Sequence, residues 1–421
     1  MKRFALILLI LSLSLAVVPG ISQAQEAISA SYDTNIEFPT ALTFSLNAES
    51  TTDITQITLS YKISQITTIS VISEVEPQFD TGPKVETSWE WDMTGNSLPP
   101  GAEIQYSWRI EDAAGYELET PWKTVQFNDN RYHWKSLTEG KITLFWYEGD
   151  QSFARELMDS ANSALDKLAQ DTGAHLEQAA DIYIYASSQD LLGALIFPQE
   201  WTGGVAFPEY GIIIIGIAPD NLAWGKMAMA HELAHLVTYQ MTSNPYSDIP
   251  TWLNEGLSMY AQGPLDPTFE SLLDKAISED NLFSVQTLSS NFPADPEGAR
   301  LSYAESYSLI QFLIQHYGQE KMLSLLSTFK QGSTYDDALE KVYGFDTTGL
   351  DNLWRLSLGL EPRQTTPTPQ ATPTPRTGFL GCREASAKTA HNGVAGLGAL
   401  GILMLPVLGE AIRLRARRGK R

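Results

Sequence analysis

Cysteine and glycan acceptor sites are nearly missing from this sequence. Cys382 is the only cysteine, so the 421-residue chain cannot form an internal disulfide. The sequence also contains no Asn-x-Ser/Thr acceptor for N-linked glycans. If the protein is exported, these two absences favour a prokaryotic cell envelope over a eukaryotic cell surface.

Basic side chains are also scarce. The chain has 28 lysine and arginine residues against 50 aspartate and glutamate residues, which gives a formal net charge of -22. A nucleic-acid-binding protein needs a basic footprint, so we expect no nucleic-acid partner. Hydrophobic residues make up 43% of the sequence, and the chain is long enough for two or three domains with buried cores.

The N-terminal residues 1–24 are typical of a secretory signal peptide. Lys2 and Arg3 precede the apolar run 5–18, and small residues follow at 22–24. An uncleaved membrane anchor is the alternative interpretation. The apolar run is short for a membrane span, which favours the signal peptide.

The C-terminal end combines a linker, an apolar segment and a basic tail. Residues 364–377 are rich in alternating threonine and proline, which favours an extended spacer of roughly 40 Å at about 3.1 Å per residue. Residues 393–412 are expected to form a transmembrane segment, followed by a basic cytoplasmic tail at 413–421. A sorting tail removed after export is the alternative. The ends together predict an exported, membrane-anchored protein of the cell surface, with the intervening residues outside.

Residues 28–130 have the pattern of an all-β domain. Apolar and polar side chains alternate along 57–63 and 104–110, as in half-buried strands. We expect an immunoglobulin- or fibronectin-like β-sandwich, because the segment 98–101 followed by Tyr106 resembles the tyrosine corner of those domains. Three tryptophans of this region are expected in the core rather than on a carbohydrate-stacking surface: Trp89, Trp91 and Trp108.

The region 134–360 has an α+β pattern. A small mixed sheet is expected first, and after residue 221 the chain is mostly helical. The expected strands span 141–147, 181–185 and 211–217. The expected helices span 221–242, 250–262, 266–278, 301–317 and 319–331, with two shorter pieces before residue 360.

The strongest chemical signal is the motif His231-Glu232-Leu-Ala-His235 inside an apolar helical run. Positions four apart share one face of a helix, so both imidazoles can reach one metal ion. A catalytic zinc site also needs a third protein ligand and an open position. Glu255 supplies that ligand after a gap of nineteen residues, 236–254. The pattern predicts a Zn²⁺ site held by the two histidines and Glu255, with Glu232 as the general base that activates a water.

These residues resemble the gluzincin zinc metallopeptidases. The pair His-Glu-Leu-Ala-His and Trp252-Leu-Asn-Glu255-Gly is similar to the aminopeptidase branch, whereas the nineteen-residue gap is similar to the thermolysin branch. The overall likeness, over residues 140–358, is to bacterial peptidase MA-like domains. It implies a zinc peptidase with a two-lobed cleft and a peptide or protein substrate.

The resemblance also points to a further catalytic residue. In aminopeptidases, a segment similar to Leu301-Ser-Tyr303-Ala carries a tyrosine that hydrogen-bonds the oxyanion. Tyr303 falls at that position, and a phenol is a suitable donor there. The alternative is a core or cleft tyrosine with Tyr307 as its neighbour.

Two departures from the family pattern bear on function. Thermolysin-like enzymes orient the first histidine with an aspartate four residues after the glutamate ligand, and Met259 stands at that position here. Segment 201–207 lacks the glutamate with which aminopeptidases hold a free amine, which argues against aminopeptidase action. Its glycines indicate either an edge strand that pairs with an extended peptide or a structural turn.

The sequence therefore predicts a membrane-anchored extracellular zinc metallopeptidase. One alternative is a catalytically inactive surface protein with a binding or structural role, against which the intact Glu232 argues. The other is a zinc hydrolase of a non-peptide bond, which the same ligand set allows.

Overall fold

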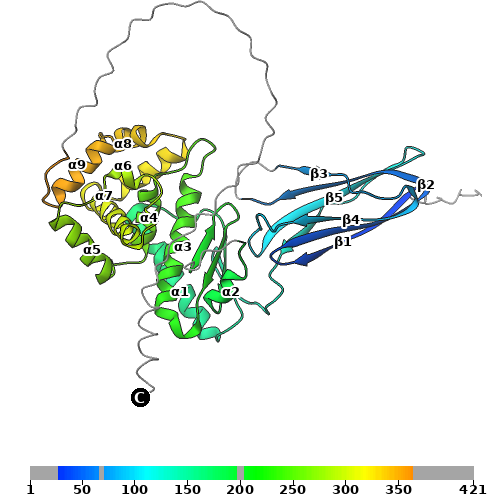
Figure 1. Ribbon diagram of the computed structural model, residues 1–421, viewed down its shortest axis with the longest axis horizontal. Helices are drawn as coiled ribbons and strands as arrows, with labels where there is room; N and C mark the ends of the chain where they lie inside the picture. The colour runs from blue at the N-terminus through cyan, green and yellow to red at the C-terminus, as the bar shows by residue number, and fades with distance from the viewer. Residues whose placement is uncertain (1–26, 66–70, 197–202, 364–421) are drawn as a thin grey trace, which may run out of the picture.

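The computed structural model describes residues 27–65, 71–196 and 203–363 (Figure 1). The predicted signal peptide, the Thr/Pro linker, the membrane segment 393–412 and the basic tail lie outside these residues. Among the described residues, no helix is long and apolar enough to cross a membrane. Figure 1 shows an elongated β domain beside a second domain whose C-terminal part is helical, as predicted.

The N-terminal domain is all-β, as its alternating pattern predicted. Its likeness to immunoglobulin or fibronectin domains remains a prediction. The strands are β1 (Ile28–Glu37), β2 (Ala41–Ile63), β3 (Ser73–Val75), β4 (Gly82–Asp92), β5 (Ala102–Asp112), β6 (Glu117–Glu119) and β7 (Lys123–Phe127).

Strand β2 joins the two parts of this domain. Residues 41–49 pair antiparallel with β1 on one edge and with β4 on the other. The pairing register shifts between Glu49 and Ile54, and residues 54–63 then pair with β5. The seven strands therefore form one continuous sheet through β2.

Aromatic rings pack the two parts of the β domain together. The Phe44 ring of β2 lies 5.0 Å from Tyr106 of β5, and Tyr61 lies 5.3 Å from Trp89 of β4. Trp108 has no exposed surface and is a core residue, as expected. Trp89 and Trp91 are half-buried and stack on each other, so they contribute to the same packing.

The second domain is built on a five-stranded mixed sheet. Its order is β11-β12-β10-β9-β8, with the three central strands parallel and both edge strands antiparallel. The strands are β8 (Lys135–Glu139), β9 (Ile142–Trp146), β10 (Ala180–Tyr185), β11 (Gly204–Phe207) and β12 (Ile212–Gly216). The predicted strand segments at 141–147, 181–185 and 211–217 are therefore all present.

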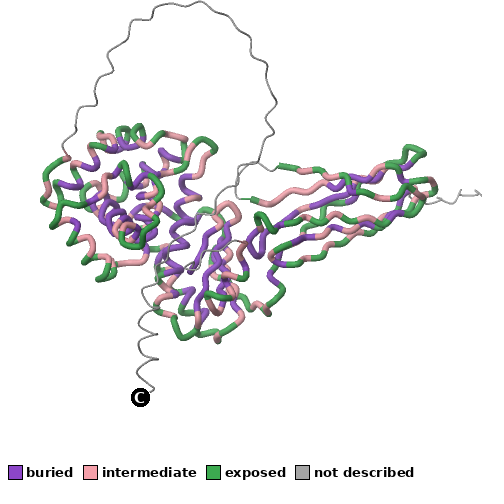
Figure 2. The backbone as a smooth tube through the Cα atoms, viewed as in Figure 1, coloured by how far each residue is buried: buried purple, intermediate pink, exposed green. Residues whose placement is uncertain are grey.

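The three central strands of this sheet are mostly buried (Figure 2). Alternate side chains of β10 and β12 enter two different cores. Ile213 and Ile215 of β12 join the core under helices α1 (Gln151–Thr172) and α3 (Leu222–Thr242). Ile212 and Ile214 join the core of the β domain instead. Leu191 of helix α2 (Ser188–Leu192) belongs to this second core as well, so α2 and residues of the β domain both contribute to the packing on this face.

A buried aspartate holds the segment that connects the two domains in place. Asp129 has no exposed surface and accepts hydrogen bonds from the Arg131 guanidinium and, at 2.9 Å, from the Tyr185 hydroxyl. Gly101 of the β domain has φ of 85°, and a side chain there would collide with the hydroxyl of Tyr183. The contact between the domains therefore depends on close approach as well as on apolar burial.

The C-terminal half is helical, as predicted. One predicted boundary is wrong: the helix expected from residue 301 begins at Pro296, because Asp295 caps it through the Gly298 N–H. The break at Gly318 is present, with φ of 78°. The remaining helices are α2 (Ser188–Leu192), α4 (Thr251–Ala261), α5 (Pro267–Ser278), α6 (Val285–Leu288), α7 (Pro296–Lys330), α8 (Tyr335–Tyr343) and α9 (Thr347–Ser357).

Glu305 of α7 is a buried carboxyl group outside the metal-ligand motif. Both of its oxygens accept from the Phe283 N–H at 3.1 Å, and the side chain has no exposed surface. Burial raises its pKa from 4.5 to about 8, against the lowering effects of the Phe283 hydrogen bond and the Arg363 charge. The folded protein therefore holds a proton that the unfolded chain loses between about pH 4.5 and pH 8.

This proton makes stability depend on pH. Because the folded state binds more protons in that window, Glu305 lowers the free energy of unfolding as pH rises. Glu305→Gln keeps an acceptor for Phe283 and removes the charge. The variant should gain stability relative to wild type by up to about 1 kcal/mol per pH unit between about pH 5 and pH 8. Urea denaturation across this range tests the expectation, and a pH-independent difference contradicts it.

Candidate metal centre

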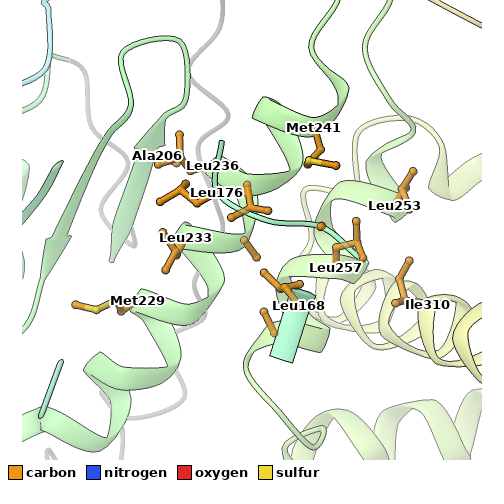
Figure 3. Close-up of a cluster of buried hydrophobic side chains, with 14 of the residues drawn as sticks. Leu168, Leu176, Ala206, Met229, Leu233, Leu236, Met241, Leu253, Leu257 and Ile310 are labelled. Carbon is orange, nitrogen blue, oxygen red and sulfur yellow. The ribbon is translucent and has the colours of Figure 1, made fainter. Parts of the chain in front are cut away.

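Helix α3 carries the His-Glu-x-x-His motif through the middle of the second domain. It packs against α1, α4 and α7 and against the sheet edge formed by β11 and β12. Figure 3 shows the apolar side chains around it, including Leu233 of α3, Leu257 of α4 and Ile310 of α7. Because apolar neighbours surround it, the helix buries residues on all its faces and takes the motif side chains into the core.

The structure brings the three predicted ligands together. One ligand atom each from His231, His235 and Glu255 lies within 4.8 Å of the others. The Glu255 Oε2 atom is 3.6 Å from Nε2 of His231 and 3.5 Å from Nε2 of His235. All three side chains are buried, with exposed fractions of 1%, 4% and 4%.

The chemistry of these donors fits zinc. Both Nε2 atoms and the Glu255 Oε2 atom are buried without a hydrogen-bond partner in the protein. Buried polar atoms without partners are costly and rare, so an unpaired set that converges on one point indicates a ligand. Two imidazole nitrogens and a carboxylate oxygen are a catalytic zinc set with a fourth position left for water.

Burial keeps both histidines in the form that binds metal. Desolvation lowers the pKa of His231 to about 3. It also lowers the pKa of His235 to about 4, although the nearby charge of Glu255 opposes the shift. Neutral imidazoles offer a lone pair at neutral pH, which a metal ligand requires.

Glu232 lies between α3 and the edge strand β11. Its side chain has no exposed surface, and both carboxylate oxygens are buried without a hydrogen-bond partner among the described residues. A Cβ atom on Gly204 would lie 2.8 Å from Glu232 Oε1, so only glycine leaves room for the carboxylate there. Burial, followed by the charge of Glu255, raises the pKa of Glu232 well above its usual value.

Helix α4 positions the third ligand by packing closely on α7. A Cβ atom on Gly256 would lie 2.5 Å from the backbone oxygen of Ser306. The absence of a side chain lets the two helices approach, while Trp252 and Leu253 on the preceding turn are buried in the core. Glu255 therefore points toward the histidines of α3.

Helix α4 also supplies partners for the outer ring nitrogens. Asn254 Oδ1 lies 3.0 Å from Nδ1 of His235, and the Gln262 amide lies 2.5 Å from Nδ1 of His231. Neither contact is predicted by the motif pattern. The available signal was spacing: Gln262 follows Glu255 by seven residues, or two helical turns, and so lies on the same face of α4.

The two candidate tyrosines occupy different surroundings. The Tyr303 ring lies 6.4 Å from the His231 ring and 5.2 Å from Phe292. The Tyr307 ring lies 6.0 Å from Tyr260 instead. Tyr303 is therefore the member of the pair next to the metal ligands.

The site has the donor set of a catalytic zinc centre. Residues 160–359 match the family described as the Peptidase MA superfamily, and this range contains all the candidate ligands and Glu232. The match confirms the relationship to gluzincin-type peptidases that the motifs indicated and supports a zinc peptidase. The matched residues lie after the N-terminal β domain.

Solved zinc peptidases are similar to the chain at low identity. An M1 zinc metallopeptidase from Deinococcus radiodurans is 13% identical, with 83% of this chain and 97% of that chain covered and a TM-score of 0.30. A mutant of an M1 zinc metallopeptidase from that organism, bound to a Tyr-Ser-Ala substrate, is 11% identical, with 83% and 97% covered and a TM-score of 0.33.

Legionella pneumophila aminopeptidase A in complex with aspartic acid is 13% identical, with 80% of this chain and 50% of that chain covered and a TM-score of 0.32. No curated protein matches the sequence. At these TM-scores, the likeness to solved structures carries no argument about the substrate.

The convergent donors predict the metal content of the protein. The purified full-length protein should contain about one equivalent of zinc by elemental analysis. His231→Ala combined with His235→Ala should abolish that content, because two of the three ligands are lost. Glu232→Gln should retain it, because Glu232 is not a ligand. Unchanged zinc in the double variant would refute the ligand assignment.

Proposed function

We propose that the protein is a zinc metallopeptidase that hydrolyses peptide bonds with Glu232 as general base. The observation that carries the proposal is the convergence of three buried, unpaired donors beside a fully buried glutamate. His231, His235 and Glu255 would hold the ion. When bound, zinc lowers the pKa of a coordinated water and polarises the scissile carbonyl.

Glu232 would move the proton in this reaction. Its carboxylate accepts the proton of the attacking water and then delivers it to the leaving amine. The close approach of Gly204 places the carboxylate against β11.

An extended peptide is the substrate that the edge strand suits. β11 pairs with β12 on one side, and no other strand pairs with it among the described residues. A free strand edge offers backbone donors and acceptors to an added strand. Because β11 also contacts α3, a peptide on this edge would run next to Glu232. This supports the edge-strand interpretation of segment 201–207 for its described residues.

Tyr303 is the proposed oxyanion donor. Its ring is beside His231, and a phenol hydroxyl can stabilise charge that develops on the substrate carbonyl. Its exposed fraction of 5% places the ring within the packed centre. Tyr307, with its ring next to Tyr260, is its matched control.

The test of the proposed function is peptide cleavage by wild type and Glu232→Gln. A peptide library incubated with the purified protein, and analysed by mass spectrometry, should show cleavage that a zinc chelator abolishes. Glu232→Gln should lower turnover by roughly 10²–10⁴-fold while keeping the metal, because glutamine cannot accept the proton. Near wild-type cleavage by this variant would refute the mechanism.

The tyrosine pair serves as the second arm of the same assay. Tyr303→Phe should lower kcat with little change in KM, because the interaction is made mainly in the transition state. Tyr307→Phe should leave kcat unchanged, and the opposite result would move the role to Tyr307. A wild type that binds zinc and cleaves nothing would instead favour a binding role for the domain.

We also propose that the protein is exported and anchored at the prokaryotic cell surface, with its catalytic domain outside. Two features support this: the signal-like residues 1–24, and the apolar segment 393–412 with its basic tail. The Thr/Pro linker 364–377 would hold the enzyme away from the membrane, with the β domain as a stalk or docking module.

Protease shaving of intact cells tests this placement. The treatment should release a fragment that contains α3 and ends near the linker, because the linker is the extended connection to the membrane. Truncation before residue 393 should release the protein into the medium. Recovery of full-length protein from the cytosol of unbroken cells would refute the topology.

A further inference from the structure

The outer nitrogen of His231 meets an amide where related peptidases are expected to place an aspartate. Met259, one turn after the Glu255 ligand, stands at the aspartate position. Gln262, at the C-terminal end of α4, reaches past it to within 2.5 Å of His231 Nδ1. The same amide lies 3.3 Å from the Met259 sulfur, so Met259 contacts the side chain of Gln262.

The position of Gln262 is set by the helix that carries the third ligand. It follows Glu255 by two helical turns and has αR backbone angles, with φ of -63° and ψ of -22°. Its own N–H bonds to the Tyr260 oxygen. The ligand and the amide therefore belong to one rigid element and are placed together relative to α3.

The protonation of a metal-binding imidazole decides which end of the amide faces it. His231 points Nε2 toward Glu255, so the metal takes Nε2 and the ring proton stays on Nδ1. A protonated Nδ1 only donates, so its partner must be an acceptor. A half-turn of the terminal amide exchanges its nitrogen and oxygen at the same location, and amide geometry alone does not distinguish them.

We infer that Gln262 is the positioning residue of His231, accepting the Nδ1–H bond through its Oε1 atom. The inference rests on the metal site of the proposed function. Asn254 does the same for His235, with its Oδ1 already 3.0 Å from Nδ1. Both outer contacts thus come from amides of the α4 segment, which fix ring orientation without ligating the ion.

Charge explains why an amide suits this place. The carboxyl groups of Glu232 and Glu255 are both buried beside the histidines. A carboxylate at position 262 would add a third buried negative charge. An amide supplies the acceptor that the imidazole needs and leaves the net charge of the centre unchanged.

The test is the zinc affinity of three variants of the full-length protein, measured by competition with a chromophoric chelator. Gln262→Leu removes the acceptor and should weaken zinc binding by about 10–100-fold. Gln262→Glu restores an acceptor and should recover much of the zinc affinity that Gln262→Leu loses. This rescue separates orientation of the ring from simple filling of space.

Gln240→Leu is the matched control. Gln240 is buried at the far end of α3, where its Oε1 accepts from the N–H groups of Glu177 and Gln178. The control should lower the thermal stability of the protein and leave zinc affinity unchanged, because it touches no ligand. An equal loss of affinity in Gln240→Leu and Gln262→Leu would mean general destabilisation and overturn the inference.

The remaining outcomes separate this inference from the proposed function. If wild type binds zinc and Gln262→Leu binds it equally well, Gln262 does not position His231 and the proposed function stands. If Gln262→Glu binds as weakly as Gln262→Leu, the acceptor is not what matters and the inference fails. If wild type binds no zinc, the proposed function and this inference fail together.

Discussion

The burial of α3 on all its faces is the constraint on which the rest of the structure depends. A helix with a polar face would keep its histidines and glutamate in contact with water. Here the same side chains enter a core made by the sheet and three helices, where each polar atom needs a partner. The outer nitrogens find amides, and the inner donors converge on one another. The proposed metal binding follows from this convergence of buried ligand atoms.

Close backbone approach then decides where the site lies within the core. The missing side chain of Gly204 lets β11 touch the proposed base, and that of Gly256 lets α4 settle on α7. Helix α4 and its end carry Glu255, Asn254 and Gln262 as one unit. A displacement of this helix moves a ligand and both outer partners at once. Glycine packing at two contacts thus controls the alignment of four catalytic-site side chains.

Local patterns predicted the parts of the molecule that depend on local geometry. The spacing of His231 and His235 places them on one helical face in any fold, and the alternating strands of the β domain needed only period-two burial. Glu255 came from family likeness and motif spacing rather than from geometry. Gln262 and Gly204 were missed, because their roles exist only once α4 and β11 lie against α3.

The early start of α7 was missed for a different reason. Pro296 fits the first turn of a helix, and Asp295 is a suitable cap, but the apolar period begins only at Leu301. The continuous sheet through β2 was likewise not predictable, because the shift of register near Ile54 depends on which strands lie alongside. The period of the apolar side chains predicts which residues are buried, but it does not predict which strands or helices they pack against.

One apolar core extends across the contact between the two domains. The side chains of β10 and β12 that face away from α1 and α3 share a core with the β domain, and the Asp129 hub ties the connecting segment to Tyr185. The family match begins at residue 160, within α1, so it leaves out the β domain that shares this core. The boundary between the domains in the sequence is therefore not a boundary of the apolar packing. Removal of the β domain would expose to solvent the face of the sheet that carries Tyr183 and Ile214.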